Sequence, residues 1–380
     1  MKIKEIKQLA DIPQHRNIVL YGAGRGGTRF LEVLRHFRPG LKVEYFIDSF
    51  QPGEASGLPV LSLAQFLETK NSRPPVTILV TSLYSEQISR VLITNGIDDF
   101  YSVSPVFFYP PEYNTRLTPG EHKINEKEIE HSRFLLTHPR DIELYDILTS
   151  RVHGFDTPID AISHYFYHES IQSGRQYFDF IQWEKVQTII EGGVFDGKST
   201  LSFLEWTNPG VFIYGFEPNH KNFTQSPYFP RLSKEPRVKI IPSGLWSRSQ
   251  RLTLTDQLDA SGIITDASPS NPTSIKPSCF EIDVVSIDEF VLQHQIERVD
   301  FIKMDIEGAE MEALNGASNT IKTHRPQLAI SVYHKKEDIF RIPFYLSQLL
   351  ENYRYRIGHY SPVFCETVWY GIPGEFALSS

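Results

Sequence analysis

The chain has 380 residues, a length that predicts two or three domains rather than one. Hydrophobic residues make up 40% of it and aromatic residues 13%, which is enough for packed cores. The formal net charge of −8 argues against a dominant nucleic-acid or anionic-membrane surface, so we expect no nucleic-acid partner and no membrane partner.

The sequence shows no signal for export or membrane insertion. The N-terminal stretch MKIKEIKQLADIPQ lacks the apolar core of a signal peptide, and no apolar run approaches about 18 residues. The two cysteines, Cys279 and Cys365, are not in metal-ligand spacing and are expected to be reduced thiols. These features predict a cytoplasmic protein without a transmembrane helix.

A strand, a glycine-rich turn and a helix are predicted near the N-terminus. The strand is Asn17–Tyr21, and a helical pattern runs over residues 28–37. Between them, three glycines follow the spacing G-x-G-x-x-G: Gly22, Gly24 and Gly27. A second strand, Val43–Ile47, ends at Asp48, 21 residues after Gly27. A dinucleotide-binding fold places its ribose-binding acid at about this spacing.

Strands and helices keep alternating to residue 104, which predicts a doubly wound α/β unit of about four strands over residues 17–104. The phrases GAG, FIDS and GLPVLS resemble the small sugar-nucleotide- or NAD-binding-like domains fused to sugar-modifying bacterial enzymes. This resemblance implies a nucleotide, NAD or nucleotide-sugar site on Gly22, Gly24, Gly27 and Asp48. The alternative is a Rossmann-like domain that serves for packing or dimerisation, because the unit is short for a complete NAD domain.

Residues 105–183 are predicted to form a proline-rich linker followed by a helical cap. Proline at the density found in residues 104–120 does not fit helices or central strands. Apolar residues then recur at helical spacing in residues 124–136 and 142–152. An aromatic cluster, Tyr165–Tyr167, interrupts this pattern before the next domain.

A second nucleotide-binding pattern begins at the apolar run Val186–Ile190, which is typical of a strand buried on both faces. Three glycines end this run: Gly192, Gly193 and Gly197. A helix over residues 198–205 and a strand over residues 211–216 follow, and Glu217 comes 20 residues after Gly197. An acid at the end of the second strand can accept two hydrogen bonds from a ribose diol. The stretch therefore predicts a nucleoside site, and a plain βαβ unit with a loose turn is the alternative.

Further strands and helices alternate through the rest of the chain. Strands are predicted at residues 238–242, 252–255, 261–265, 281–286, 299–304 and 327–333. Helices are predicted after Asp288 as N-cap, over residues 310–322 and over residues 342–350. Two closing strands, at residues 353–358 and 366–371, are joined by a short loop and fit an antiparallel hairpin at the edge of the sheet.

Three motifs now stand in order: IIEGGVFDGKST, YGFEPNHKNF and FIKMDIEGAEMEAL. Together they resemble the FkbM family of S-adenosylmethionine (AdoMet)-dependent methyltransferases, which are mostly O-methyltransferases. The resemblance covers residues 186–373, about half of the chain, and implies a seven-stranded class I methyltransferase sheet. The first motif departs from the usual form, because Glu191 stands where many members have Asp.

The resemblance implies an AdoMet site at the carboxyl ends of the strands, where ligands of open α/β sheets bind. The implied residues, from the amino-acid end of AdoMet to its adenine, are Glu191, Gly193, Gly197, Glu217, Ser243 and Leu245. Among them, Glu217 would hold the ribose hydroxyls and Leu245 would form an apolar wall.

Two residues that follow predicted strands are candidates for catalysis. We expect Asp305 and His334 to flank the acceptor oxygen, with one of them acting as general base. No metal is expected, and a divalent ion held by Asp305, Glu310 and His334 is the alternative. Glu307 and Glu310 also fit helix N-terminal capping, where the helix dipole favours acids, and His334 also fits an ordinary loop histidine.

The sequence thus predicts two doubly wound Rossmann-like α/β domains, a nucleotide-binding-like one over residues 1–104 and an AdoMet-dependent methyltransferase over residues 184–380. The predicted reaction is O-methylation of a hydroxyl on a sugar or other small-molecule acceptor. An NAD(P)-dependent oxidoreductase that uses the N-terminal glycine motif is the alternative, and a non-catalytic scaffold is a third interpretation. A homodimer is the expected oligomeric state.

Overall fold

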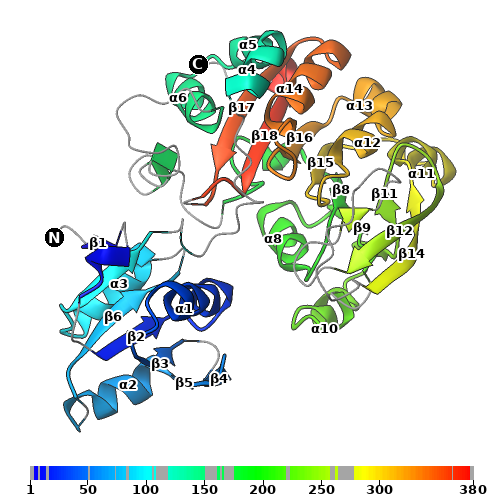
Figure 1. Ribbon diagram of the computed structural model, residues 1–380. Coiled ribbons are helices and arrows are strands. Elements are labelled where there is room, and N and C mark those ends of the chain that lie inside the picture. The colour runs from blue at the N-terminus through cyan, green and yellow to red at the C-terminus, as the bar shows by residue number, and fades with distance from the viewer. Residues whose placement is uncertain are drawn as a thin grey trace. The chain divides into compact units, whose positions relative to one another are not determined.

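The apolar runs at the start of the chain form parallel strands of one sheet in the computed structural model of this protein (Figure 1). The strands are β1 (Glu5–Ile6), β2 (Asn17–Tyr21), β3 (Val43–Ile47), β4 (Gly53–Ala55), β5 (Leu58–Leu61), β6 (Val76–Val80) and β7 (Phe100–Val103). Their order across the sheet is β1-β7-β6-β2-β3-β5-β4, and only the β4–β5 pair is antiparallel.

Helices cover both faces of this first sheet, because successive residues of β2 point to opposite sides. Ile18 and Leu20 pack in one cluster with Phe30 of α1 (Arg25–Phe37). Val19 and Tyr21 pack in another cluster, with residues of α2 (Leu63–Thr69) and α3 (Ser85–Thr94). The sheet is therefore doubly wound, as predicted.

The chain divides into two units, Met1–Asn114 and Thr115–Ser380, and each is described by itself. The structure describes residues 4–6, 9–13, 17–49, 52–72, 74–82, 85–104, 107, 119–149, 161–162, 165–166, 175–219, 223–256, 262–263, 278–361 and 363–376. Most of the predicted proline-rich linker lies outside the described residues. Within them, no helix combines the length and the hydropathy needed to span a membrane.

The main sheet of the second unit has five parallel strands and a closing hairpin. Its strands are β8 (Thr188–Gly192), β9 (Phe212–Phe216), β10 (Val238–Ile241), β15 (Phe301–Met304), β16 (Gln327–Ser331), β17 (Tyr353–His359) and β18 (Thr367–Pro373). Their order is β10-β9-β8-β15-β16-β18-β17, and β18 is antiparallel to both of its neighbours. This is the seven-stranded sheet with an antiparallel edge hairpin that the sequence predicts.

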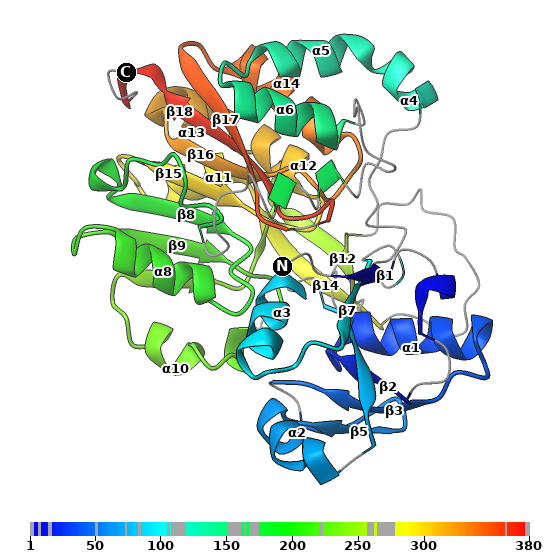
Figure 2. The same ribbon diagram turned by 90° about the vertical axis from the view of Figure 1, so that its left-hand side faces the viewer.

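Apolar residues cover both faces of this sheet as well. On one face, Phe203 of α8 (Lys198–Trp206) packs 5.6 Å, between ring centroids, from Phe301 of β15. On the other, Phe290 of α11 (Ile287–Gln293) lies 4.9 Å from Phe216 of β9. Figure 2 shows α8 beside β8 and β9. The remaining helices that follow β8 in the chain are α10 (Phe229–Leu232), α12 (Glu310–Asn315), α13 (Ser318–His324) and α14 (Asp338–Leu349).

A small second sheet adjoins the loop after β10. Its strands are β11 (Gly244–Leu245), β12 (Gln250–Asp256), β13 (Gly262–Ile263) and β14 (Ser278–Val285), in the order β11-β14-β12-β13. The backbone N–H of Trp246 donates to the Val285 carbonyl at 3.0 Å, which extends the β11–β14 pairing beyond Leu245. This pairing fixes the loop that carries Ser243 and Leu245.

Helices that precede the sheet in sequence pack against its last strands and helix. These are α4 (Pro119–Ile124), α5 (Glu126–Phe134) and α6 (Pro139–Leu148). Both views place α5 and α6 beside α14 and β17 (Figures 1 and 2). The hydroxyl of Ser132 donates to the Phe340 carbonyl at 2.8 Å, and the Arg356 Nε donates to the buried Asp141 at 2.5 Å. These helices therefore belong to the packing of the second unit.

Three details differ from the sequence prediction, each through a local cause. The first sheet has seven strands rather than about four, because β1, β4 and β5 are too short to show periodicity. The expectation that Asp288 caps α11 is wrong: Ser286 does, accepting from the Glu289 N–H at 3.1 Å. The single helix predicted over residues 310–322 is broken at Gly316, where a side chain would meet the Trp246 carbonyl oxygen at 2.2 Å.

Candidate active site

The glycine turn between β8 and α8 is closed against the end of β15. Gly193 has a φ of +78°, and a Cβ at this position would lie 1.9 Å from the Asp305 carbonyl oxygen. Gly197, the N-cap of α8, has a φ of +84°, and its Cβ would lie 2.3 Å from Leu232 Cδ1. Both positions require glycine for their backbone conformation and for the close contact. The turn therefore lies directly beside Asp305.

A buried ammonium group holds the same turn. Lys303 lies in β15 and is only 2% exposed, and its Nζ donates to the carbonyls of Gly192 at 3.0 Å and Gly193 at 2.5 Å. Lys303 is not among the site residues predicted from the sequence. A lysine inside the apolar strand FIKM was the available signal, since a buried charge needs polar partners.

Glu217 closes the turn from the end of β9. Its Oε2 accepts from the Phe195 N–H and its Oε1 from the Asn219 N–H, both at 2.8 Å. Burial raises the pKa of Glu217, while these two N–H groups oppose the rise. Each oxygen keeps a further lone pair, so the carboxylate can still accept from a ligand.

Glu191, at the opposite side of the turn, is fully buried. Its two oxygens accept from the hydroxyls of Ser199 at 2.5 Å and Thr200 at 2.7 Å, both in the first turn of α8. Burial raises the pKa of Glu191, and the charge of Lys303 opposes the rise. The carboxylate therefore anchors α8 to the sheet.

The two residues predicted to lie near the adenine are on the loop after β10. The Ser243 hydroxyl donates to the Asp283 carbonyl at 2.8 Å, which ties the loop to β14. Leu245 is buried, and its Cδ1 would lie 2.8 Å from a Cβ on Gly192. Leu245 thus packs against the glycine turn.

Asp305 is held by two tyrosine hydroxyls. Tyr177 donates to its Oδ2 at 2.6 Å and Tyr333 to its Oδ1 at 2.9 Å. Burial alone would raise the pKa of Asp305, but the charges of Lys303 and His334 and the tyrosine hydrogen bonds lower it below its usual value. Asp305 is therefore anionic. No local pattern in the sequence indicates a role for Tyr177, which is distant from Asp305 in the chain.

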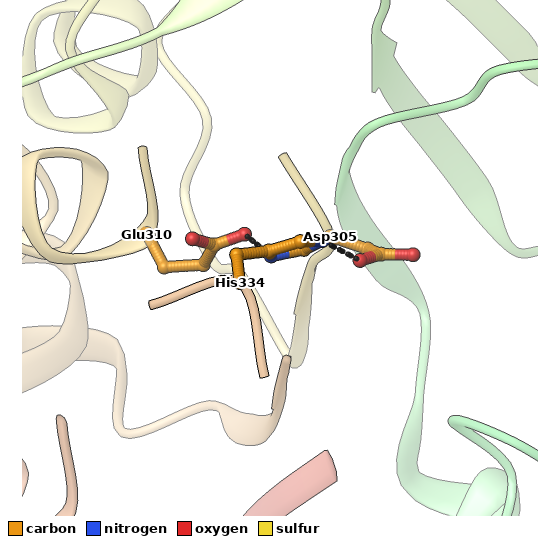
Figure 3. Close-up of side chains that lie close together, drawn as sticks. All are labelled: Asp305, Glu310 and His334. Carbon is orange, nitrogen blue, oxygen red and sulfur yellow. Dashed lines mark ion pairs between the residues drawn. The ribbon is translucent and has the colours of Figure 1, made fainter. Parts of the chain in front are cut away.

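His334 lies between two carboxylates (Figure 3). Its Nδ1 is 2.9 Å from Glu310 Oε1, and its Nε2 is 3.4 Å from Asp305 Oδ1 and 3.7 Å from Glu307 Oε2. Burial disfavours the charged ring, but Glu310 and the other two carboxylates outweigh it and raise the pKa of His334 to about 10. Burial, opposed by His334, raises the pKa of Glu307 to about 7.

The residues predicted as an alternative metal site do come together. Asp305, Glu310 and His334 each offer a ligand atom, and these atoms lie within 4.8 Å of one another. Glu310 also accepts from the Ile306 N–H at 2.8 Å, so it closes the turn between β15 and α12. Glu307 does not lie in α12, and its φ of +56° places it in the left-handed region beside Gly308.

A small pocket adjoins this cluster at the carboxyl end of β16. Its lining residues come from α6, from residues 332–339, from the chain before β18 and from the start of β18: Leu148, Val332, Tyr333, Lys335, Lys336, Ile339, Phe364 and Thr367. Tyr333 connects the pocket with the cluster, because its hydroxyl binds Asp305.

The glycine turn of the N-terminal unit is tightly packed, as is the turn between β8 and α8. A Cβ on Gly27 would lie 1.8 Å from the Gly22 carbonyl oxygen, and Gly22 has a φ of +112°. Gly24, the N-cap of α1, has no neighbour within 4 Å of such a Cβ. The Asp48 Oδ2 accepts from the Ala23 N–H at 2.8 Å, as Glu217 accepts from Phe195 in the second unit. The structure therefore brings these four predicted residues together.

Comparisons with known proteins match part of the chain to a family model. Residues 193–357 match the family model of the methyltransferase FkbM domain. The chain is similar to the crystal structure of methyltransferase FkbM from Methylobacillus flagellatus KT, with a TM-score of 0.58 and 20% identity over 94% of this chain and 90% of that one. It is also similar to Aeropyrum pernix fibrillarin in complex with natively bound S-adenosyl-L-methionine, with a TM-score of 0.32 and 11% identity over 52% of this chain and 71% of that one. No curated protein matches the chain.

This match lies within the second unit and supports methyltransferase activity. The likeness to the Methylobacillus structure shows that the fold is shared.

Proposed function

From the FkbM methyltransferase domain at residues 193–357, we propose that this chain is an AdoMet-dependent O-methyltransferase. Its acceptor is a hydroxyl on a sugar or another small molecule. The observation that carries the proposal is the packing of the Gly193 turn against the backbone carbonyl of Asp305, a residue whose side chain is anionic. A carboxylate there is suited to a sulfonium cofactor, because it stabilises positive charge at the reacting centre.

The cofactor would lie across the carboxyl ends of β8, β9 and the loop after β10. Glu217 would accept hydrogen bonds from the ribose hydroxyls, and its two backbone donors hold it ready for this. Gly193 and Gly197 would allow close approach of the backbone. Leu245 would give an apolar wall for the adenine, with Ser243 fixing its loop. Glu191 would act by holding α8, since both of its oxygens are occupied.

The acceptor hydroxyl would lie next to Asp305 and His334. Its oxygen attacks the methyl carbon, the bond between carbon and sulfur breaks, and the electron pair of that bond stays on sulfur. The hydroxyl proton must leave to a base. Between the two candidates, the raised pKa of His334 keeps its proton in place at neutral pH, so Asp305 is the one that can accept. Products are a methyl ether, S-adenosylhomocysteine and one proton.

A sugar acceptor is favoured by the N-terminal unit. Its glycine turn and Asp48 have the arrangement of a nucleotide site, and we propose that they bind a nucleotide, NAD or a nucleotide-sugar. Titration with NAD and with UDP-sugars, comparing the wild type with Asp48→Asn, tests this separately. Binding that the substitution abolishes would support it, and the absence of binding for all of these ligands would overturn it.

Calorimetric titration of the full chain with AdoMet and S-adenosylhomocysteine tests the main proposal. We expect binding of both, weakened about ten- to hundredfold by Glu217→Gln, since a hydrogen bond to a charged group contributes about 1.5–3 kcal/mol. Glu205→Gln is the matched control, because Glu205 is an exposed acid of α8. No binding by the wild type, or equal binding by the two variants, would overturn the proposal. Transfer of labelled methyl to a panel of sugars then identifies the acceptor.

A further inference from the structure

The Nε2 atom of His334 has no hydrogen-bond partner among the residues that the structure describes, whereas Nδ1 lies 2.9 Å from Glu310 Oε1. The side chain is only 8% exposed, so solvent does not replace the partner that Nε2 lacks. A buried polar atom without a partner costs about 1–3 kcal/mol. Such an atom calls for an explanation, and an ion that belongs in the site is one of the accepted ones.

The two sides of the ring differ in what they face. On the Nδ1 side, Glu310 Oε1 lies at 2.9 Å, and Glu310 is only 1% exposed. On the Nε2 side, Asp305 Oδ1 lies at 3.4 Å and Glu307 Oε2 at 3.7 Å, and these side chains are 23% and 43% exposed. The Nε2 side is therefore the open one, and it faces oxygen atoms at distances too long for direct hydrogen bonds.

This arrangement has the form of a metal-binding histidine. A histidine that binds a metal through one nitrogen almost always turns the other towards a carboxylate or a carbonyl, which fixes the ring. Glu310 is the carboxylate that the second nitrogen, Nδ1, faces here. Asp305 likewise has outer partners, since Tyr177 and Tyr333 donate to its two oxygens and orient it. Ligand atoms bound at about 2.0–2.2 Å lie about 3–3.5 Å apart, which is near the separation of Nε2 and Asp305 Oδ1.

We propose that His334 Nε2 and Asp305, assisted by Glu307, bind a divalent cation such as Mn²⁺, with Glu310 holding the ring from behind. One nitrogen and two carboxylate oxygens suit such an ion, and water or an acceptor oxygen would fill its remaining positions. Binding would release the proton that Nε2 carries in the metal-free protein, because a histidine ligates a metal through an unprotonated nitrogen, and Nδ1 would keep its proton towards Glu310. This set of ligands differs from the set Asp305, Glu310 and His334, in which Glu310 is itself a ligand. A single ion bound by that set would have to contact both Asp305 and Glu310, which lie on opposite sides of the imidazole ring (Figure 3).

The role of this ion rests on the proposed methyl transfer. Bound at Asp305, the cation would contact the acceptor hydroxyl, orient it and make it more acidic. The weakly basic Asp305, whose oxygens already accept from tyrosines, could then receive the proton. Three carboxylates converge on a single imidazole here, and the cation would also neutralise part of that charge.

Titration of the full chain with Mn²⁺ tests the site through binding alone, using the electron paramagnetic resonance signal of the free ion. We expect one saturable site in the wild type. Glu310→Gln and Glu307→Gln should each weaken it, the former about 10–100-fold, as outer partners of a ligating histidine do. Glu312→Gln, a change in the same first turn of α12, is the matched control and should bind as the wild type does. Circular dichroism checks the fold of each variant.

AdoMet titration of the same samples separates this inference from the proposed function. Wild-type protein that binds AdoMet but shows no saturable Mn²⁺ site would overturn the metal site and leave the methyltransferase proposal standing. Mn²⁺ binding without AdoMet binding would support the site and overturn its proposed role. Equal weakening by Glu312→Gln and Glu310→Gln would show binding to acidic surface in general and would also overturn the site. Because Glu307 is 43% exposed, its variant gives a test even where Glu310→Gln fails to fold.

Discussion

Lys303 donates from the middle of β15 to the carbonyl of Gly192, at 3.0 Å, in the neighbouring strand β8. The ammonium also reaches the Gly193 carbonyl at 2.5 Å and lies 5.0 Å from the centre of the Tyr177 ring. One buried cation thus connects the glycine turn with a tyrosine that holds Asp305. Its charge also offsets the burial of Glu191 and Glu217.

Replacing this cation with an apolar side chain of similar length tests the connection. Lys303→Met should lower the free energy of unfolding by about 3–5 kcal/mol, because buried carboxylates lose their nearest cation. Lys303→Met should also weaken AdoMet binding more than acceptor binding, because the glycine turn loses the two hydrogen bonds that the ammonium donates to it. Lys239→Met, at an exposed position of β10, is the control. The same melting temperature and cofactor affinity in both variants would contradict this account.

Gly193→Ala should destabilise the second unit and reduce cofactor binding. The left-handed φ of +78° costs a non-glycine residue about 1–3 kcal/mol, and the methyl group would overlap the Asp305 carbonyl, 1.9 Å away. Gly210→Ala, where a Cβ would have no neighbour within 4 Å, serves for comparison. Thermal unfolding and AdoMet titration measure both effects. An alanine variant as stable as the control would mean that the turn can rearrange.

In the N-terminal unit, Gly27→Ala should loosen the sheet around β2 and β3. The added methyl group would lie 1.8 Å from the Gly22 carbonyl oxygen, and Gly40→Ala, with no neighbour within 4 Å, is the control. Hydrogen exchange followed by mass spectrometry should show faster exchange in residues 17–49. Faster exchange in β8 as well would argue against two units that fold separately.

The buried His359 should make the free energy of unfolding depend on pH. Burial lowers the pKa of His359 from its ordinary 6.5 to about 3, and its Nε2 has no partner among the described residues. The unfolded chain therefore takes up a proton near pH 6.5, whereas the folded chain does so only near pH 3. This contribution to stability is complete above pH 6.5 and is lost as the pH falls from 6.5 to 3.

His359→Phe should accordingly show a smaller loss of unfolding free energy between pH 6.5 and pH 3 than the wild type. His36→Phe, on the exposed face of α1, should keep the wild-type slope. Urea denaturation at several pH values provides the measurement. Parallel profiles for the wild type and His359→Phe would show that His359 is protonated in the folded chain.

Local patterns in the sequence were enough for the longer strands, the glycine turns and their order, but not for the short strands β1, β4 and β5. The burial of Val19, Tyr21 and the strand FIKM can be predicted from the apolar runs in which they lie. The closing hairpin can be predicted from its position at the end of the chain. Contacts between distant residues could not be predicted in this way. Tyr177 is brought to Asp305 by the fold, and Asp288 caps α13 through Thr320 instead of its own helix. Such pairings depend on packing, which a pattern of nearby residues does not encode.

The N-terminal helices of the second unit matter for how the protein can be shortened. A fragment cut at the limits of the family match, 193–357, would lose β8 at the centre of the sheet and β18 between β16 and β17. A fragment starting at residue 175 would keep both strands but would uncover Trp369, which Tyr145 of α6 contacts with ring centroids 6.3 Å apart. We therefore expect the shortest fragment of this unit that folds by itself to begin near residue 119 and to continue through residue 376.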